Sequence, residues 1–195
     1  MNYPLQLSFK HLAIARQLSV TDANGMLAFY VKQKAFKLKE AVTVFADAAQ
    51  TQPLYTMNAD KVLDFSATYD MTDHRGTYLG AVRRQGMKSI WKARYEILDK
   101  YAAPLMTIQE ANPWIKVVDA LVGEIPIIGI FTGYMFHPAY IVARPDGTEV
   151  MRLEKQPAFL HGKFKIGKLA ILTESEEIHI LLSLLMMVLL ERNRG

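Results

Sequence analysis

The chain contains no cysteine, which excludes disulfide bridges, thiolate metal sites, iron–sulfur clusters and a cysteine nucleophile. Charge is also sparse. Only 22% of residues are charged and the formal net charge is +4, so the composition is neither that of a disordered segment nor that of a polycation. With 51% hydrophobic residues among 195, the chain can bury a sizeable core, and one domain is the default expectation.

Signature motifs of enzymes are missing as well. The sequence has no HExxH, P-loop, GxSxG or EF-hand pattern, and no GxGxxG after a predicted strand. The charged turn at Asp70, Asp73 and His74 offers too few oxygens for calcium. The five histidines have no metal-ligand spacing: His11, His74, His137, His161 and His179. We therefore expect no catalytic residues, no metal, no cofactor and a non-enzymatic role.

Long apolar runs are limited to one segment near the C-terminus. Residues 178–190 read IHILLSLLMMVLL, which is shorter than the roughly 20 residues of a membrane-spanning helix and is typical of a buried helix. Thr173 and Glu176 have the spacing of a capping box at its start, and His179 within it is expected to be a core or barrel-mouth histidine. Charged residues also interrupt residues 1–20, so no secretory signal is expected. The sequence predicts a cytoplasmic protein that does not span a membrane and that is peripheral at most.

Between residues 25 and 168 the hydrophobic pattern has a period of two, which is typical of β-strands. Arg144, Pro145, Asp146 and Gly147 form the clearest turn signal. Closure of such hairpins into a barrel around the apolar helix would cover that helix and remove the sheet edges. Eleven strands are predicted, at 26–32, 42–46, 54–58, 62–70, 77–84, 88–98, 105–109, 127–131, 139–144, 149–155 and 159–166.

Two further helices are predicted on the periphery. Residues 113–122 have an Asn112 cap, Pro113 at the first position and Gly123 after the last turn, with apolar residues at helical spacing. Residues 9–18 are the second candidate. The fold class is therefore mainly β, a closed antiparallel barrel that surrounds a hydrophobic C-terminal helix, with one or two peripheral helices.

Basic residues supply the one functional signal. Arg83, Arg84, Lys88, Lys92 and Arg94 lie on two predicted strands joined by a turn, where several of them can share one outward face and bind an anion or a lipid headgroup. Lysines at 163, 165 and 168 form a second cluster, and lysines at 32, 34, 37 and 39 form a third. The alternative for any cluster is an ordinary solvated surface, because strand lysines also serve solubility and edge protection.

The order of elements resembles a known family. The hairpin units, the segment Phe164-Lys-Ile-Gly-Lys168 and the terminal helix from Glu176 to Arg192 are similar to the tubby-like superfamily, in particular its LURP-one-related and phospholipid-scramblase-like members. The resemblance implies a twelve-stranded barrel threaded by the helix. It also implies one domain over residues 1–195, in which residues 1–25 are an extension packed on the barrel and residues 176–192 are the central helix.

Charge and resemblance together favour a non-catalytic binding module at a membrane surface. Its expected partner is an anionic phospholipid or a phosphoinositide, because each basic residue near such a surface contributes about 1 kcal/mol. A protein-interaction scaffold and a nucleic-acid-binding protein without a small-molecule ligand are the alternatives. The charge is spread and no recognition helix is evident, so nucleic acid ranks below lipid and is not an expected partner, whereas a protein partner is. The calcium segment and the palmitoylated cysteines of scramblases have no counterpart in this sequence, so lipid scrambling is not expected.

Overall fold

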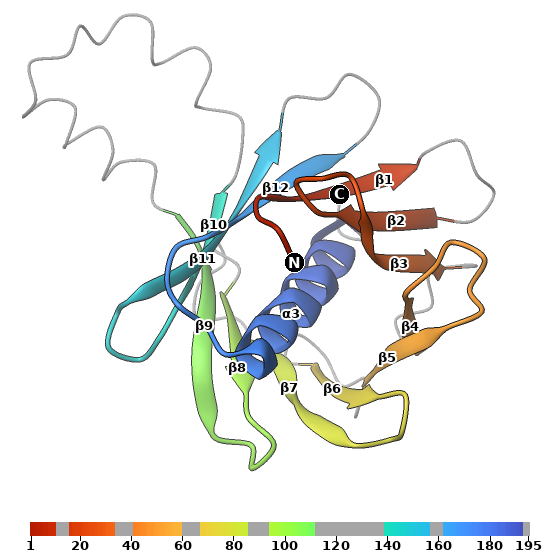
Figure 1. Cartoon of the computed structure of the whole chain (residues 1–195). Helices are drawn as coiled ribbons and strands as arrows, with labels where there is room; N and C mark the ends of the chain where they lie inside the picture. Colours follow the sequence, from red (N-terminus) through yellow and green to blue (C-terminus); the bar gives the residue numbers. More distant parts are fainter. Residues whose placement is uncertain are drawn as a thin grey trace, which may run out of the picture.

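A computed structural model gives the fold of the chain. It describes residues 1–10, 16–33, 41–59, 67–85, 94–111, 139–156 and 162–192. These residues contain twelve strands and one helix (Figure 1). The strands are β1 (Leu5–Lys10), β2 (Arg16–Thr21), β3 (Leu27–Gln33), β4 (Val42–Phe45), β5 (Pro53–Ala59), β6 (Thr68–Asp73), β7 (Tyr78–Gln85), β8 (Arg94–Leu98), β9 (Pro104–Glu110), β10 (Ala139–Ala143), β11 (Glu149–Gln156) and β12 (Lys163–Lys168), and the helix is α3 (Glu174–Arg192).

The strands form a closed antiparallel barrel in which each strand pairs with its neighbours in sequence. The seam is formed by β1 and β12, where Leu5 pairs with Ile166 and Leu7 with Phe164. Closure satisfies the backbone groups that an open sheet would leave exposed at its edges. This confirms the predicted mainly-β barrel, and its twelve strands match the number that the family resemblance implies.

The helix α3 lies inside the barrel, with strands on all sides of it (Figure 1). Every residue from His179 to Leu190 is buried, including Ser183, whose hydroxyl donates to the His179 carbonyl at 2.8 Å. A helix that is apolar on every face is stable in water only when other elements cover all of it. The strands provide that cover through alternating inward side chains, as Tyr95 and Ile97 do on β8 while Arg94 and Glu96 face outward.

The two ends of the barrel are connected differently. At the turn end, where α3 begins, the connections are 22–26, 46–52, 74–77, 99–103, 144–148 and 169–173, and all are described. At the arginine end, where α3 finishes, the connections are 11–15, 34–41, 60–67, 86–93, 111–138 and 157–162, and they lie wholly or mostly outside the described residues. We call these two ends of the barrel the turn end and the arginine end.

One turn design recurs at the turn end. In the β6–β7 connection, the Arg75 and Thr77 N–H groups donate to Asp73 Oδ1 at 2.9 and 2.8 Å, and Gly76 adopts a φ of 81°. The Asp99 turn makes the same pair of bonds, but Ala102 takes the left-handed position with a φ of 63°. Such three-residue hairpin loops end in a left-handed residue that forms a bulge. The pairing register of β6 and β7 accordingly shifts between Met71 and Thr72, which is the position of the bulge.

The N-terminal predictions are wrong. The described residues of the predicted helix 9–18, namely 9–10 and 16–18, lie in strands, and residues 1–25 are not an extension packed on the barrel, because β1 and β2 are strands of the barrel itself. Apolar residues alternate in β1 at Leu5, Leu7 and Phe9, but three residues are a short pattern. The predicted strand at 127–131 and the predicted helix at 113–122 lie outside the described residues. The two overlooked strands complete the barrel.

Candidate anion-binding site

The predicted basic cluster lies at the arginine end of β7 and β8. The structure describes three of its five residues: Arg83 and Arg84 near the end of β7, and Arg94 at the start of β8. Lys88 and Lys92 lie in the 86–93 connection, outside the described residues. The pairing register places Arg83 opposite Glu96, Arg84 opposite Tyr95, and Gln85 opposite Arg94. The carboxylates of Glu96 and Glu191 lie beside these arginines and limit what they can bind.

On the outer face, Arg83 is held by Glu96. The Arg83 Nη2 and Nε atoms both donate to Glu96 Oε2, at 2.6 and 3.1 Å, and the Gln85 amide donates to the other carboxylate oxygen. Arg94 is exposed on the same face, and among the described residues it has no carboxylate partner. The outer face therefore presents one neutralised and one free guanidinium.

Arg84 faces the barrel interior, so it is not among the residues that share the outward face of Arg83. Adjacent residues of a strand point to opposite faces, and Arg84 lies beside the inward-facing Tyr95. Its side chain is 18% exposed, against 44% for Arg83. The arginine end thus has two guanidinium groups on opposite sides of one strand.

The last turn of α3 brings a carboxylate to this interior position. The Tyr95 hydroxyl donates to Glu191 Oε1 at 2.5 Å, and Arg84 Nη2 lies 3.8 Å from the same oxygen. The Arg84 Nε atom is buried and has no hydrogen-bond partner among the described residues. Arg84 is therefore close to an anion without making a hydrogen bond to it, and one of its donors is unsatisfied.

The phenols and carboxylates of this end influence one another's protonation. Burial raises the pKa of Tyr95 well above its usual value, and the hydrogen bond to Glu191 raises it further. Burial also raises the pKa of Tyr140 to about 12, with contributions from Glu191 and Glu110. Each phenol stays protonated at neutral pH and is a hydrogen-bond donor. The group consists of one guanidinium, two phenols and two carboxylates.

At the turn end, by contrast, the capping box of α3 is closed and two glutamates of its first turn are in ion pairs. The Thr173 N–H donates to Glu176 Oε2 at 2.8 Å and the Glu176 N–H donates to Thr173 Oγ1 at 3.2 Å, which confirms the predicted capping box. Arg144 Nη2 donates to Glu176 Oε1 at 3.1 Å, and Lys168 Nζ donates to Glu177 Oε2 at 2.7 Å. The backbone of Thr173 lowers the pKa of Glu176, with help from Arg144. In the second lysine cluster, Lys168 is therefore held in an ion pair with Glu177, whereas Lys163 and Lys165 are exposed.

His179 is a core histidine, as predicted. It is buried, and burial lowers its pKa, although the carboxylate of Asp99 opposes the shift. Its ring lies against Gly80 of β7, where a Cβ atom would be 2.4 Å from His179 Cε1 and 2.3 Å from the Leu98 carbonyl oxygen. Gly80 also has a φ of 136°. The lack of a side chain at Gly80 makes room for the imidazole.

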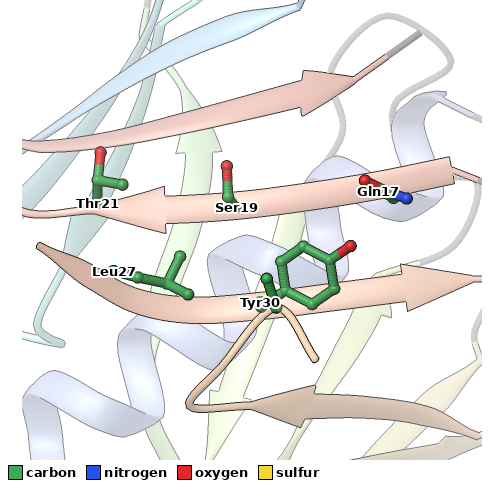
Figure 2. Close-up of a pocket in the computed structure, with 6 residues that line it drawn as sticks. Gln17, Ser19, Thr21, Leu27 and Tyr30 are labelled. Carbon is green, nitrogen blue, oxygen red and sulfur yellow. The ribbon is translucent and has the colours of Figure 1, made fainter. Parts of the chain in front are cut away.

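A groove of about 200 Å³ lies on the outer face of β2 and β3 (Figure 2). Ser19 and Thr21 extend from β2, and Tyr30 extends from β3 beside Gln17. Leu27 and Ala48 complete the lining, which holds no charged side chain. Tyr30 faces outward and yet is buried, so little of its ring is available to a ligand. An uncharged groove of this kind is a poor site for an anion.

Other site classes find no support in the described part of the chain. Within it, no three His, Asp or Glu side chains are arranged to hold a metal ion. No helix there has the length and hydropathy needed to cross a bilayer.

Sequence reasoning identified Arg84 but missed Tyr95, Tyr140 and Glu191 as its neighbours. No motif gives Glu191 a role, and the pairing of Arg84 with Tyr95 requires the register of two strands. One signal was present in the sequence: Glu191 is an acidic residue in the last turn of a helix, where the helix dipole disfavours negative charge. An unfavourable charge in such a place indicates a partner.

Comparison with known proteins places the chain in a family. No curated protein and no solved structure matches the chain significantly. The LURP-one-related family model matches residues 27–124, which is half of the chain. The matched segment runs from β3 through β9 and includes Arg83, Arg84 and Arg94. The chain belongs to the LURP-one-related family.

Proposed function

We propose that the protein is a non-catalytic binding module that associates with a membrane surface through anionic lipid or phosphoinositide headgroups, and that the arginine end makes the contact. The observation that carries the proposal is topological. Arg83, Arg84 and Arg94 lie at this end, and the connections that contain Lys34, Lys37, Lys39, Lys88 and Lys92 join strands there. A shared end lets several cations act on one surface, where each contributes about 1 kcal/mol.

The net charge of the connections favours the same orientation. The turn-end connections contain Asp22, Asp47, Asp99 and Asp146, which accept backbone hydrogen bonds within their turns. In sequence, these connections hold four acidic and three basic residues, whereas the arginine-end connections hold seven basic and five acidic ones. The excess of positive charge therefore lies in the arginine-end connections, which an anionic membrane attracts.

The barrel interior supports a binding role over catalysis. Side chains of α3 such as Leu182, Leu184 and Met187 are fully buried and occupy the space in which a barrel enzyme would hold its substrate. The surface of the barrel is left for recognition. Family membership is compatible with this role.

The wider relationships are part of the proposal. A closed barrel of twelve strands around a hydrophobic helix is what the tubby-like resemblance implied, so we infer that the whole chain is one tubby-like domain with scramblase-like relatives. We place it in the cytoplasm, peripheral to the membrane, because the acidic lipids of the cytoplasmic leaflet suit a basic surface.

The test is flotation with phosphatidylcholine vesicles, alone or with phosphatidylserine or phosphatidylinositol bisphosphate, at low and high salt. The triple variant Lys88→Glu/Lys92→Glu/Arg94→Glu should lose at least about tenfold in binding to the anionic vesicles. A matched control reverses exposed cations of the turn end, Arg75→Glu and Lys100→Glu, and should bind like the wild type. Equal losses in both variants would contradict the arginine end as the contact.

A protein-interaction scaffold is the second candidate. Large apolar side chains are exposed in several turn-end connections, with Ile171 at 91%, Tyr101 at 78% and Met26 at 66%. Exposed apolar residues gathered at one end are typical of a surface that a partner covers. A chain that bound no vesicle at either salt concentration would favour this function over lipid binding.

A further inference from the structure

Two arginines that are adjacent in sequence each face a glutamate, but on opposite sides of β7. Outside, Arg83 donates two hydrogen bonds to Glu96, and its side chain is 44% exposed. Inside, Arg84 approaches Glu191 no closer than 3.8 Å, and its Nε is buried without a partner. The same residue type is therefore satisfied on one face and under-satisfied on the other.

The unsatisfied donors of Arg84 fit an oxyanion. A guanidinium presents N–H groups in a fixed fork that matches two oxygens of a phosphate or carboxylate, and a buried donor without a partner is costly. Tyr95 adds a hydroxyl donor beside the fork, since it pairs with Arg84 across the sheet. A phosphate group offers enough acceptors for both residues.

Glu191 occupies this position as an internal anion. Its side chain is 28% exposed, so solvent reaches it. It lies in the last turn of α3, where the carbonyl ends of the helix disfavour a carboxylate. Its hydrogen bond from Tyr95 is its one direct bond among the described residues, because Arg84 is beyond hydrogen-bonding distance. A carboxylate held in this way is open to exchange with a stronger anion.

We propose that Arg84 and Tyr95 form a phosphate-binding site at the arginine end, and that Glu191 inhibits it by occupying the place of the ligand. The ligand class is a phosphate monoester, borne by a lipid headgroup or by a soluble inositol phosphate. This inference rests on the proposed function and adds to it the residues that bind and the residue that competes. Binding moves Glu191 away from Tyr95 and frees the last turn of α3.

The test compares two neutralising substitutions that are matched in chemistry. Glu191→Gln removes the negative charge of the inner competitor, and Glu96→Gln removes the negative charge of the outer partner of Arg83. Affinity for phosphatidylinositol bisphosphate vesicles should rise about five- to tenfold in Glu191→Gln, because a competing state is removed together with a negative charge, and should rise less in Glu96→Gln, which removes the same charge from this end but no competitor. Unchanged or weaker binding by Glu191→Gln would overturn the inference. A rise in Glu96→Gln alone would place the site on the outer face, at Arg83.

Soluble ligands separate the two sources of phosphate. Inositol hexakisphosphate that competes with vesicles for the Glu191→Gln protein would show that the site reads the phosphate itself, whereas vesicle binding without competition would show that it requires the lipid surface. Arg84→Gln should abolish the gain in the Glu191→Gln background. A gain that survived would overturn the role of Arg84.

Hydrogen exchange gives a readout that does not depend on Arg84→Gln folding correctly. In the wild-type protein, saturating inositol hexakisphosphate or vesicles should speed amide exchange at residues 188–192, because the ligand releases Glu191. Slower or unchanged exchange at these amides, in a sample that binds, would contradict displacement.

The same measurements separate this inference from the proposed function. If the wild type binds anionic vesicles, loses binding in the Lys88/Lys92/Arg94 triple variant and is unaffected by Glu191→Gln, the proposed function stands and the internal inhibitor does not. If neither the wild type nor Glu191→Gln binds vesicles or inositol hexakisphosphate, both fall. Binding by Glu191→Gln alone would support both, with the wild type in its inhibited form.

Discussion

The first turn of α3 carries Glu174, Glu176 and Glu177 where the helix dipole favours negative charge, whereas its last turn carries Glu191 where the dipole opposes it. At the first turn, Glu176 and Glu177 are paired with Arg144 and Lys168, and the capping box is closed. At the last turn, Glu191 has one hydrogen bond and a more distant arginine. The two ends of one helix thus differ in how well their charges are compensated.

This difference indicates a division of work along the helix. The turn end holds α3 in position, because it combines short turns, ion pairs and the close fit of His179 against Gly80. The arginine end leaves donors of Arg84 unused, which is a cost in stability that a ligand can relieve. Stability should therefore be sensitive to substitutions at the turn end, and ligand binding should be sensitive to those at the arginine end.

The largest expected effect is from Gly80→Ala. The new Cβ would overlap the Leu98 carbonyl oxygen and the His179 ring, and the φ of 136° is strained for alanine. We expect a loss of about 3 kcal/mol or more in the free energy of unfolding, from strain and overpacking together. Urea denaturation measures it.

Gly167→Ala on β12 is the matched control, because a Cβ atom at this position would meet no other atom within 4 Å and the backbone φ lies outside the left-handed region. It should change stability by no more than about 1 kcal/mol. Gly80→Ala/His179→Ala should recover only part of the loss, since the Leu98 carbonyl oxygen stays in place. Full recovery of stability in the double variant would show that the His179 ring is the only group that requires glycine at position 80.

The second effect compares the two helix ends directly. Thr173→Ala removes the cap and should cost about 1 kcal/mol. Glu191→Gln should change stability by no more than about 0.5 kcal/mol, because glutamine still accepts from Tyr95 and no longer opposes the dipole. Ser175→Ala, at an exposed position of the first turn, is the control for Thr173→Ala. A cost at Glu191 equal to that at Thr173 would remove the contrast between the ends.

The third effect is a dependence on pH. Burial lowers the pKa of His179 in the folded state, so below about pH 6.5 the unfolded chain binds a proton that the folded chain does not. Stability should therefore fall as the pH drops below about 6.5, down to the folded-state pKa. Thermal melts across this range should show a shallower fall in His179→Leu.

The smallest effect concerns the turns. Ala102 adopts the left-handed conformation that Gly76 provides in the equivalent turn. Ala102→Gly should stabilise the protein by about 0.5–1 kcal/mol, since relief of the steric cost exceeds the added chain entropy. Gly76→Ala should destabilise by a similar amount. Thermal melts should show changes in melting temperature of opposite sign for the two variants. Changes of the same sign would show that the turns are not equivalent.

Much of the fold could be predicted from local patterns. The all-round apolar run at 178–190, the cap at Thr173 and the period of two in the strands each follow from the side chains of one segment. Closure of a barrel followed because such a helix needs cover on every side. What failed was β1 and β2, where the apolar alternation is short and the pairing of β1 with β12 depends on residues more than 150 positions away.

The site was less predictable because it depends on facing and register. Arg83 and Arg84 form one basic pair in the sequence, but adjacent residues of a strand point to opposite faces of the sheet. The contact between Tyr95 and Glu191 joins residues 96 positions apart. Lys88 and Lys92 lie outside the described residues, so their role in lipid binding stays a prediction.

The seam between β1 and β12 also has a consequence for synthesis. Residues 5–8 find their partners at 163–166, and the core-filling helix comes later still. A ribosome therefore releases nearly the whole chain before the barrel can close, and until then the first strand exposes unpaired backbone and apolar side chains such as Leu5 and Leu7. Late closure of this kind slows folding and invites aggregation of the nascent chain. Chaperone protection during translation should matter more for this protein than for one whose contacts are local.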